Sequence, residues 1–267
     1  MNALTRSMRA ELLRLRRWPA IWVTVTAWLL LDAMFGYVFG FVTYTSGRSS
    51  FSNEGQTPAE LLATLVPSGL ADALPQGMPL FGGAIMMVLG AIVAGNGFGW
   101  GTWKTAFTQG PSRESTILGS MGAVVLLVAG IVVATLALDT ALSLGVAAAE
   151  SQPVTWPAVS DTLQSLGGAF LVMEMWALAG YFLGMVARGP AVSVGLGLVW
   201  ALVIEGLLRG VGTSLTAVAV FTHFLPGTAA GSLIGSIVGA GGPSPTPGLL
   251  DTLSGTRALV TLVAWMV

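Results

Sequence analysis

The chain has no cysteine and one histidine, His223. Without cysteine it cannot form disulfides, attack a substrate with a thiolate or bind a metal through sulfur. A single histidine likewise excludes a histidine-rich metal site. We therefore expect no metal site in this chain.

Charged residues are also scarce, at 9% of the 267 residues, and the formal net charge is -1. The positive residues fall in small clusters and form no broad basic face, which predicts that nucleic acid is not a partner. Hydrophobic residues make up 54% of the chain, and the mean hydropathy is positive. Because this composition leaves too little polar surface for a soluble globule, it predicts an integral membrane protein embedded in a lipid bilayer.

Apolar runs of about 20 residues, long enough to cross a bilayer as a helix, recur along the chain. They predict complete spans at residues 18–44, 78–96, 117–146, 163–186 and 191–208. A sixth span begins near Arg257, but the remaining residues to Val267 cover only about half of a crossing. We expect that the natural chain continues and that this span is cut short. The predicted fold is an all-α polytopic membrane protein with six transmembrane helices, and residues 1–267 form a single transmembrane domain.

Lysine and arginine are distributed unevenly between the two sides of this topology. One side holds eight of them: Arg6, Arg9, Arg14, Arg16, Arg17, Lys104, Arg113 and Arg188. The alternate loops hold Arg48, Arg209 and Arg257 and most of the acidic loop residues. By the positive-inside rule, the N-terminus and the loop of residues 95–113 are cytoplasmic in a multi-pass protein of the cell membrane.

The first seventeen residues have the pattern of an amphipathic helix. Leu4, Met8, Leu12 and Leu15 share one face at helical spacing, and the arginines occupy the other. Residues 1–17 therefore predict a helix lying in the membrane interface. The alternative is a basic flank that only orients the first span.

Residues 210–254 are apolar but broken. The runs at residues 213–225 and 228–240 are each shorter than a crossing, and Pro226 and Gly227 separate them with a turn signal. We expect an outward-facing re-entrant helical hairpin here.

The segment "GNGFGWGTWKTAFTQGPSR", residues 95–113, contains five glycines, two tryptophans and the only lysine of the chain. A phosphate-binding loop needs glycine directly before the lysine, and here Trp103 precedes Lys104. The dinucleotide-binding glycine pattern also fails, since its spacing is wrong and no strand precedes it. The loop is therefore not predicted to bind a nucleotide.

The same loop predicts a short amphipathic helix. Trp100, Trp103 and Phe107 fall on one face, and Ser112 is placed to cap the next span. The largely opposite polar face is formed by Gly101, Thr105, Thr108 and Gln109, with Lys104 at its margin. This pattern suits docking to a soluble partner. The alternative is an aromatic belt that packs in the membrane interface.

Two segments resemble type-2 ABC exporter permeases. "GWGTWKTAFTQGPSR" has their Gly-Thr pair, basic residue and downstream Pro-Ser-Arg, and "MRAELLRLRRWPAIW" is similar to their N-terminal helix with Glu11 and a basic run. One position departs from the family: a glutamate is common four residues before the Gly-Thr pair, where this chain has Gly97. The family's six spans and re-entrant pair also match the predicted outline.

This resemblance implies the transmembrane subunit of an ATP-driven exporter, paired with an identical or homologous second permease. ATP and Mg²⁺ would be bound by separate cytoplasmic ATP-binding subunits, so no cofactor and no enzymatic activity are expected in this chain itself. Residues 97–113 would form the coupling loop that docks on those subunits. The docking residues would be Trp100, Gly101, Thr102, Trp103, Lys104, Thr105, Phe107 and Arg113.

Four carboxylates fall within or at the ends of predicted spans: Asp32, Asp139, Glu174 and Glu205. A charge at the bilayer centre costs about 2.5–3.5 kcal/mol, so such residues are candidates for function. We expect Glu174, Glu205 and Asp32 to line a substrate path. The alternative places Asp139 at the outer interface and has Asp32 and Glu205 protonated or hydrogen-bonded between helices.

Two other functions compete with the exporter. A proton-coupled secondary transporter would use Glu174 or Glu205, but it favours inverted repeats, and the sequence has no such internal symmetry. An intramembrane enzyme would need a nucleophile with a base or a metal cluster, which a lone His223 does not supply.

Overall fold

The structure is a computed structural model, and it describes residues 3–47, 57–109, 112–239 and 248–267. Within these residues all regular secondary structure is helical, and no strand occurs. Five helical segments are long and apolar enough to cross a membrane: Pro19–Ser46, Met78–Gly99, Arg113–Ala149, Val159–Ala187 and Pro190–Gly212. These confirm the predicted all-α multi-pass membrane protein and its five complete spans.

Three of the spans contain a π-helical turn, so each is described by more than one element. Span one is α2 (Pro19–Asp32), η1 (Ala33–Val38) and α3 (Phe39–Ser46), and span two is η3 (Met78–Gly82) and α6 (Gly83–Gly99). Spans three and four are the single helices α8 (Arg113–Ala149) and α9 (Val159–Ala187), and span five is α10 (Pro190–Leu198), η4 (Val199–Ile204) and α11 (Glu205–Gly212). The remaining elements are α1 (Ala3–Arg17), α4 (Pro58–Leu65), η2 (Pro67–Gly69), α5 (Leu70–Ala73), α7 (Thr102–Gln109), α12 (Thr216–Thr222), α13 (Pro226–Ile237) and α14 (Gly255–Met266).

The centre of the bundle is the contact between α6 and α9, where two glycines bring the backbones together. A side chain at Gly90 would overlap the carbonyl oxygen of Ala177, and one at Gly180 would overlap that of Met87. Small residues permit this close approach of membrane helices, which gains van der Waals contact. Spans two and four are accordingly the most buried of the five.

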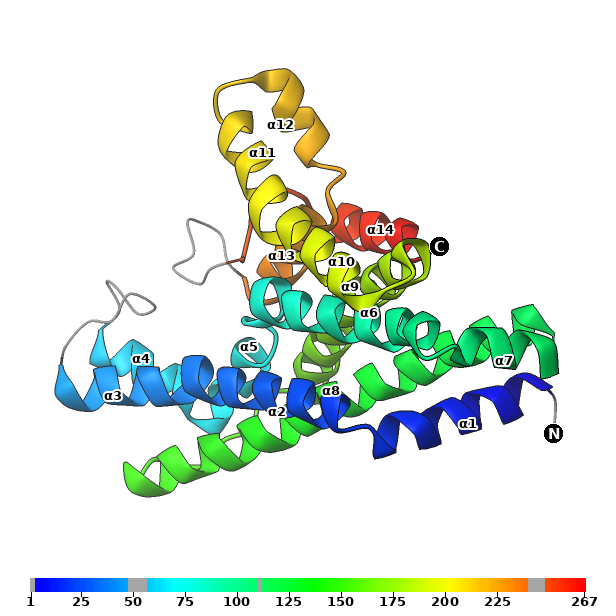
Figure 1. The fold of residues 1–267 in the computed structure, drawn as a ribbon. Coiled ribbons are helices and arrows are strands. Elements are labelled where there is room, and N and C mark those ends of the chain that lie inside the picture. Colours follow the sequence, from blue (N-terminus) through cyan, green and yellow to red (C-terminus); the bar gives the residue numbers. More distant parts are fainter. Residues whose placement is uncertain (1–2, 48–56, 110–111, 240–247) are drawn as a thin grey trace.

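Helix α1 packs lengthwise on the first turns of α8 (Figure 1). Ser7 lies against Gly119, Leu15 is buried, and Met8 and Leu12 are partly buried against the core. Three of the four residues of the predicted apolar face therefore rest on protein, and the fourth, Leu4, is 41% exposed. That the helix lies in the membrane interface stays a prediction.

Two short helices, α12 and α13, lie between span five and α14, and a bend of 72° separates them. The sequence predicted a turn at Pro226 and Gly227, but these two residues do not form it. They are the first residues of α13, where proline is well tolerated because the first helical N–H has no intrahelical partner. The bend therefore lies at residues 223–225. Span five also extends to Gly212, so the segment that was predicted from residue 210 begins inside it. The bend is compatible with a broken span or a re-entrant loop, and the outer hairpin stays a prediction.

Candidate functional site

The loop between spans two and three contains a separate short helix. Helix α6 ends at Gly99, Gly101 makes a left-handed turn with φ of +66°, and α7 runs from Thr102. Glycine suits this turn because other residues strain in the left-handed region. The prediction that Trp100 shares a helical face with Trp103 is wrong, since the turn separates Trp100 from α7.

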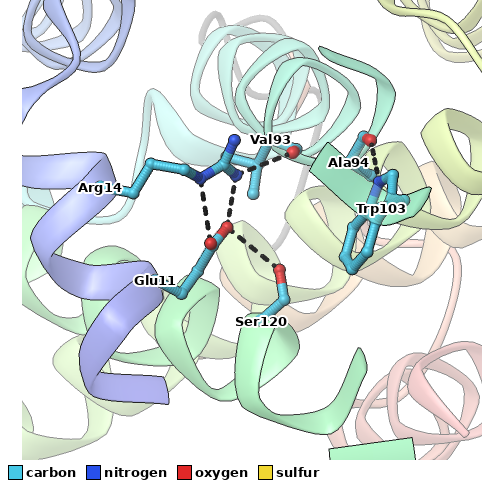
Figure 2. A network of polar contacts seen from close by, with 6 residues as sticks. All are labelled: Glu11, Arg14, Val93, Ala94, Trp103 and Ser120. Atoms are coloured by element: carbon cyan, nitrogen blue, oxygen red, sulfur yellow. Dashed lines mark hydrogen bonds and ion pairs between the residues drawn. The ribbon is translucent and has the colours of Figure 1, made fainter. Parts of the chain in front are cut away.

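Trp103 attaches α7 to the end of span two. Its side chain is buried, and its Nε1–H donates a 2.9 Å hydrogen bond to the carbonyl oxygen of Ala94 (Figure 2). The indole occupies the space beside Gly97, where a side chain would overlap it. A glutamate at position 97 would therefore have no room. Phe107 stacks on Trp103 one turn later, with 5.5 Å between ring centroids.

The opposite face of α7 is accessible. Thr102, Lys104 and Thr105 are exposed, and the hydroxyls of Thr105 and Thr108 bond only to backbone oxygens of the same segment. The predicted docking residues thus separate into two anchors, Trp103 and Phe107, and an exposed polar surface.

Two further docking candidates lie at the edges of the loop. Trp100 is 61% exposed and contacts Trp18 edge to face, with ring centroids 5.2 Å apart. The Arg113 guanidinium lies 6.0 Å from the centre of the Phe107 ring, within cation–π range. Ser112 caps α8 as predicted, accepting a 3.3 Å hydrogen bond from the backbone N–H of Ser115.

A second polar network connects α1 to spans two and three (Figure 2). Arg14 forms an ion pair with Glu11, and it also donates a 3.2 Å hydrogen bond to the carbonyl oxygen of Val93. The Ser120 hydroxyl donates at 3.3 Å to Glu11 Oε1, the oxygen that also accepts from Arg14 Nη2. This network was not predicted from the sequence. Its only local signal was the helical spacing of three residues between Glu11 and Arg14.

Asp32 and Asp139 meet inside the bundle. Their carboxyl groups are hydrogen-bonded to each other, and Tyr37 lies beside both. Asp139 is 1% exposed, because span one packs against α8 and covers it. Its expected depth at the outer interface stays a prediction. Both aspartates and Tyr37 also carry a buried oxygen without a hydrogen-bond partner among the described residues.

Glu174 lies in the interior of α9 and is 1% exposed. Neither of its carboxyl oxygens has a hydrogen-bond partner in the described part of the chain. Its neighbours Met173, Met175 and Trp176 are also buried, so the side chain faces protein and not lipid. Of the four carboxylates in the spans, Glu174 is the one with both oxygens buried and without a hydrogen-bond partner among the described residues.

Glu205, in contrast, has several partners. Trp200 Nε1–H donates a 3.1 Å hydrogen bond to it, and the Arg209 guanidinium lies 3.6 Å away. Its carboxylate also lies against Gly227 at the amino end of α13, where a side chain would overlap it. The partially positive end of a helix stabilises an anion, so Glu205 links span five to α13.

The three substrate-path candidates therefore occupy different environments. Asp32 pairs with Asp139, Glu205 with Arg209, and Glu174 lacks a partner among the described residues. No group of three or more histidine or acidic side chains that could bind a metal occurs in the described ranges.

Comparison with known proteins assigns no family to the chain. No protein-family model matches it, and a search of curated proteins finds no match.

Proposed function

We propose that this chain is the transmembrane subunit of an ATP-driven exporter, similar to the type-2 ABC permeases, and that α7 docks on a cytoplasmic ATP-binding subunit. The observation that carries the proposal is the geometry of α7. Trp103 anchors the helix to span two, while Thr102, Lys104 and Thr105 remain accessible. A short helix held rigidly at the end of two spans can transmit movement of a docked partner to those spans.

A second permease subunit, identical or homologous, completes this proposal. Spans one and five leave large apolar side chains exposed, among them Trp22, Leu30, Leu196 and Leu207. Lipid or a second subunit would cover them. In this arrangement ATP and Mg²⁺ bind to the partner ATPase, and Glu174, Glu205 and Asp32 contribute polar groups to the substrate path.

Co-expression with candidate ATP-binding subunits tests the docking assignment. Lys104→Glu combined with Thr105→Glu should reduce co-purification of the ATPase and lower its chain-dependent hydrolysis of ATP. Membrane insertion should be unaffected because both side chains are exposed. Arg257→Glu is the control, since it also reverses an exposed charge but lies at the start of α14. Normal co-purification and transport by the double variant would refute the docking role of α7.

The proposed orientation has an independent test. The chain has no native cysteine, so a single cysteine at Thr108 or at Gln152, both exposed, reports one side of the membrane. An impermeant thiol reagent should label Gln152→Cys in intact cells and should leave Thr108→Cys unlabelled until the membrane is opened. The reverse pattern would place α7 outside and exclude cytoplasmic docking.

A proton-coupled secondary transporter is the second candidate, and the buried Glu174 favours it. Such a transporter would work in vesicles that contain no ATP but have a proton gradient. The exporter instead requires ATP and its ATPase subunit, so transport in sealed vesicles under the two conditions separates the candidates.

A further inference from the structure

A cavity of about 630 Å³ opens between α1, the carboxyl end of α6, α7 and the first turns of α8. Its charged lining residues are Arg6, Glu11 and Arg14. Both oxygens of Glu11 already accept hydrogen bonds, from Arg14 and Ser120. The Glu11 carboxylate is therefore already paired, and the two arginines leave the cavity lining with a net positive charge.

Arg6 and the hydroxyls of Ser7 and Thr102 line this cavity and can still donate hydrogen bonds. Arg14 Nη1 also has no hydrogen-bond partner among the described residues, but it is buried and so out of reach of a ligand in the cavity. Arg6 is exposed and forms no ion pair in that part of the chain. The guanidinium fork of arginine matches the oxygens of a phosphate group, so the cavity offers the donors that a phosphate needs.

The position of the cavity along the bundle matches the membrane surface. It is lined by Thr116, directly before the apolar run of α8 that begins at Ile117. The exposed indoles of Trp22 and Trp100 lie at the same ends of spans one and two. Tryptophans typically gather at the level of the lipid headgroups, which places the cavity next to lipid phosphates.

We propose that this cavity binds the phosphate group of an anionic phospholipid. Arg6 would contact the phosphate, and Ser7 and Thr102 line the same space, where their hydroxyls would donate to it. The exposed Arg16 and Arg17 at the end of α1 would attract anionic lipid to this surface. A lipid bound here touches both α1 and α7, so it would hold the two helices in a defined relative position. This lipid site belongs to the chain by itself and needs no ATPase partner.

Thermal unfolding of the purified full chain in phosphatidylcholine and detergent micelles tests this proposal. Addition of phosphatidylglycerol should raise the unfolding temperature in a saturable way. Arg6→Gln should weaken the apparent affinity about tenfold, the effect of losing one charged hydrogen bond. Arg9→Gln is the matched control, because it removes the same charge from an exposed position of the same helix outside the cavity. Ala106→Phe, which fills the cavity without changing charge, should also abolish the lipid-dependent shift.

Three outcomes would overturn the proposal. Equal loss in Arg6→Gln and Arg9→Gln would mean diffuse attraction between lipid and α1. A shift produced by inorganic phosphate, with none from phosphatidylglycerol, would make free phosphate the ligand. If phosphatidylglycerol does not raise the unfolding temperature of the folded wild-type chain, the cavity does not bind anionic lipid, and a segment of a soluble protein becomes the expected ligand.

Discussion

The carboxyl groups of Asp32 in span one and Asp139 in α8 are hydrogen-bonded to each other within the helical bundle. Two carboxyl groups can form this bond only when one of them carries a proton, because two carboxylates offer acceptors alone. The pair therefore links spans one and three. One further oxygen of each aspartate and the Tyr37 hydroxyl are buried without a hydrogen-bond partner among the described residues. Substitutions at the pair should therefore be poorly tolerated.

Asp139→Asn should preserve this link, because its amide can donate a hydrogen bond to Asp32. Asp139→Leu removes every partner and should lower the free energy of unfolding by about 1–3 kcal/mol, the usual cost of a buried polar group that loses its hydrogen bond. Thermal unfolding in detergent compares the two. Equal destabilisation by Asn and Leu would contradict a direct bond between the carboxyl groups.

Glu174 should act through its charge or through its shape, and two variants distinguish these. If the anion contributes to the substrate path, Glu174→Gln should be expressed at a normal level but alter export, most of all of cationic substrates. If the residue is structural, Gln should be silent and Glu174→Leu should reduce protein abundance. Export and membrane abundance are measured for both variants. Unchanged export and abundance in both would remove Glu174 from either role.

Gly227→Ala should disturb the contact between span five and α13. The added methyl group would overlap the Glu205 carboxylate, which must then move from Trp200 and Arg209. We expect a loss of about 1–3 kcal/mol in unfolding free energy from overpacking. Gly210→Ala in α11 is the control, since nothing lies within 4 Å of the added atom. Equal stability of both variants would show that Glu205 does not lie against Gly227.

Gly90→Ala should destabilise the central contact of α6 and α9. The new methyl group would overlap the backbone of Ala177, and backbone cannot move aside as a flexible side chain can. A loss of about 1–3 kcal/mol is expected from overpacking. Gly130→Ala, in the open part of α8, should instead be neutral or stabilise the helix by up to about 1 kcal/mol. Unfolding temperatures in one detergent test the pair, and a tolerated Gly90→Ala would refute this packing.

The capping box of α4, outside the spans, predicts a dependence on pH. Hydrogen bonds from the Thr57 backbone N–H, at 2.7 Å, and from its hydroxyl, at 2.8 Å, lower the pKa of the Glu60 carboxyl below its ordinary value of 4.5. A lowered pKa in the folded state means that the ionised form stabilises the helix above the unfolded pKa. This contribution is lost as the pH falls through the folded pKa.

Hydrogen exchange of α4, corrected for intrinsic rates, should therefore show protection near neutral pH and loss of protection in acid. Glu60→Gln should make this protection independent of pH over the same range. A wild-type acid response that persists in Glu60→Gln would assign the effect to another group.

The spans could be predicted from sequence because each depends on a local property. An apolar run of sufficient length forms a helix in lipid whatever its neighbours, since every backbone group must be bonded within the segment. The five complete spans, the amphipathic pattern of α1 and the Ser112 cap follow from such local rules. The break between α6 and α7 at Gly101 was not predicted, because a glycine within a helical pattern does not by itself show whether the backbone turns there.

The meeting of Asp32 with Asp139, of Arg14 with Val93 and of Trp103 with Ala94 was decided only by tertiary structure. Hydropathy determines that a helix spans the membrane, but it does not determine the rotation of that helix about its axis or its neighbours. Those depend on close packing, such as the Gly90 and Gly180 contacts, which sets how α6 lies on α9. Buried polar groups find their partners only after this packing is complete, because a hydrogen bond needs its two atoms placed within about 3 Å.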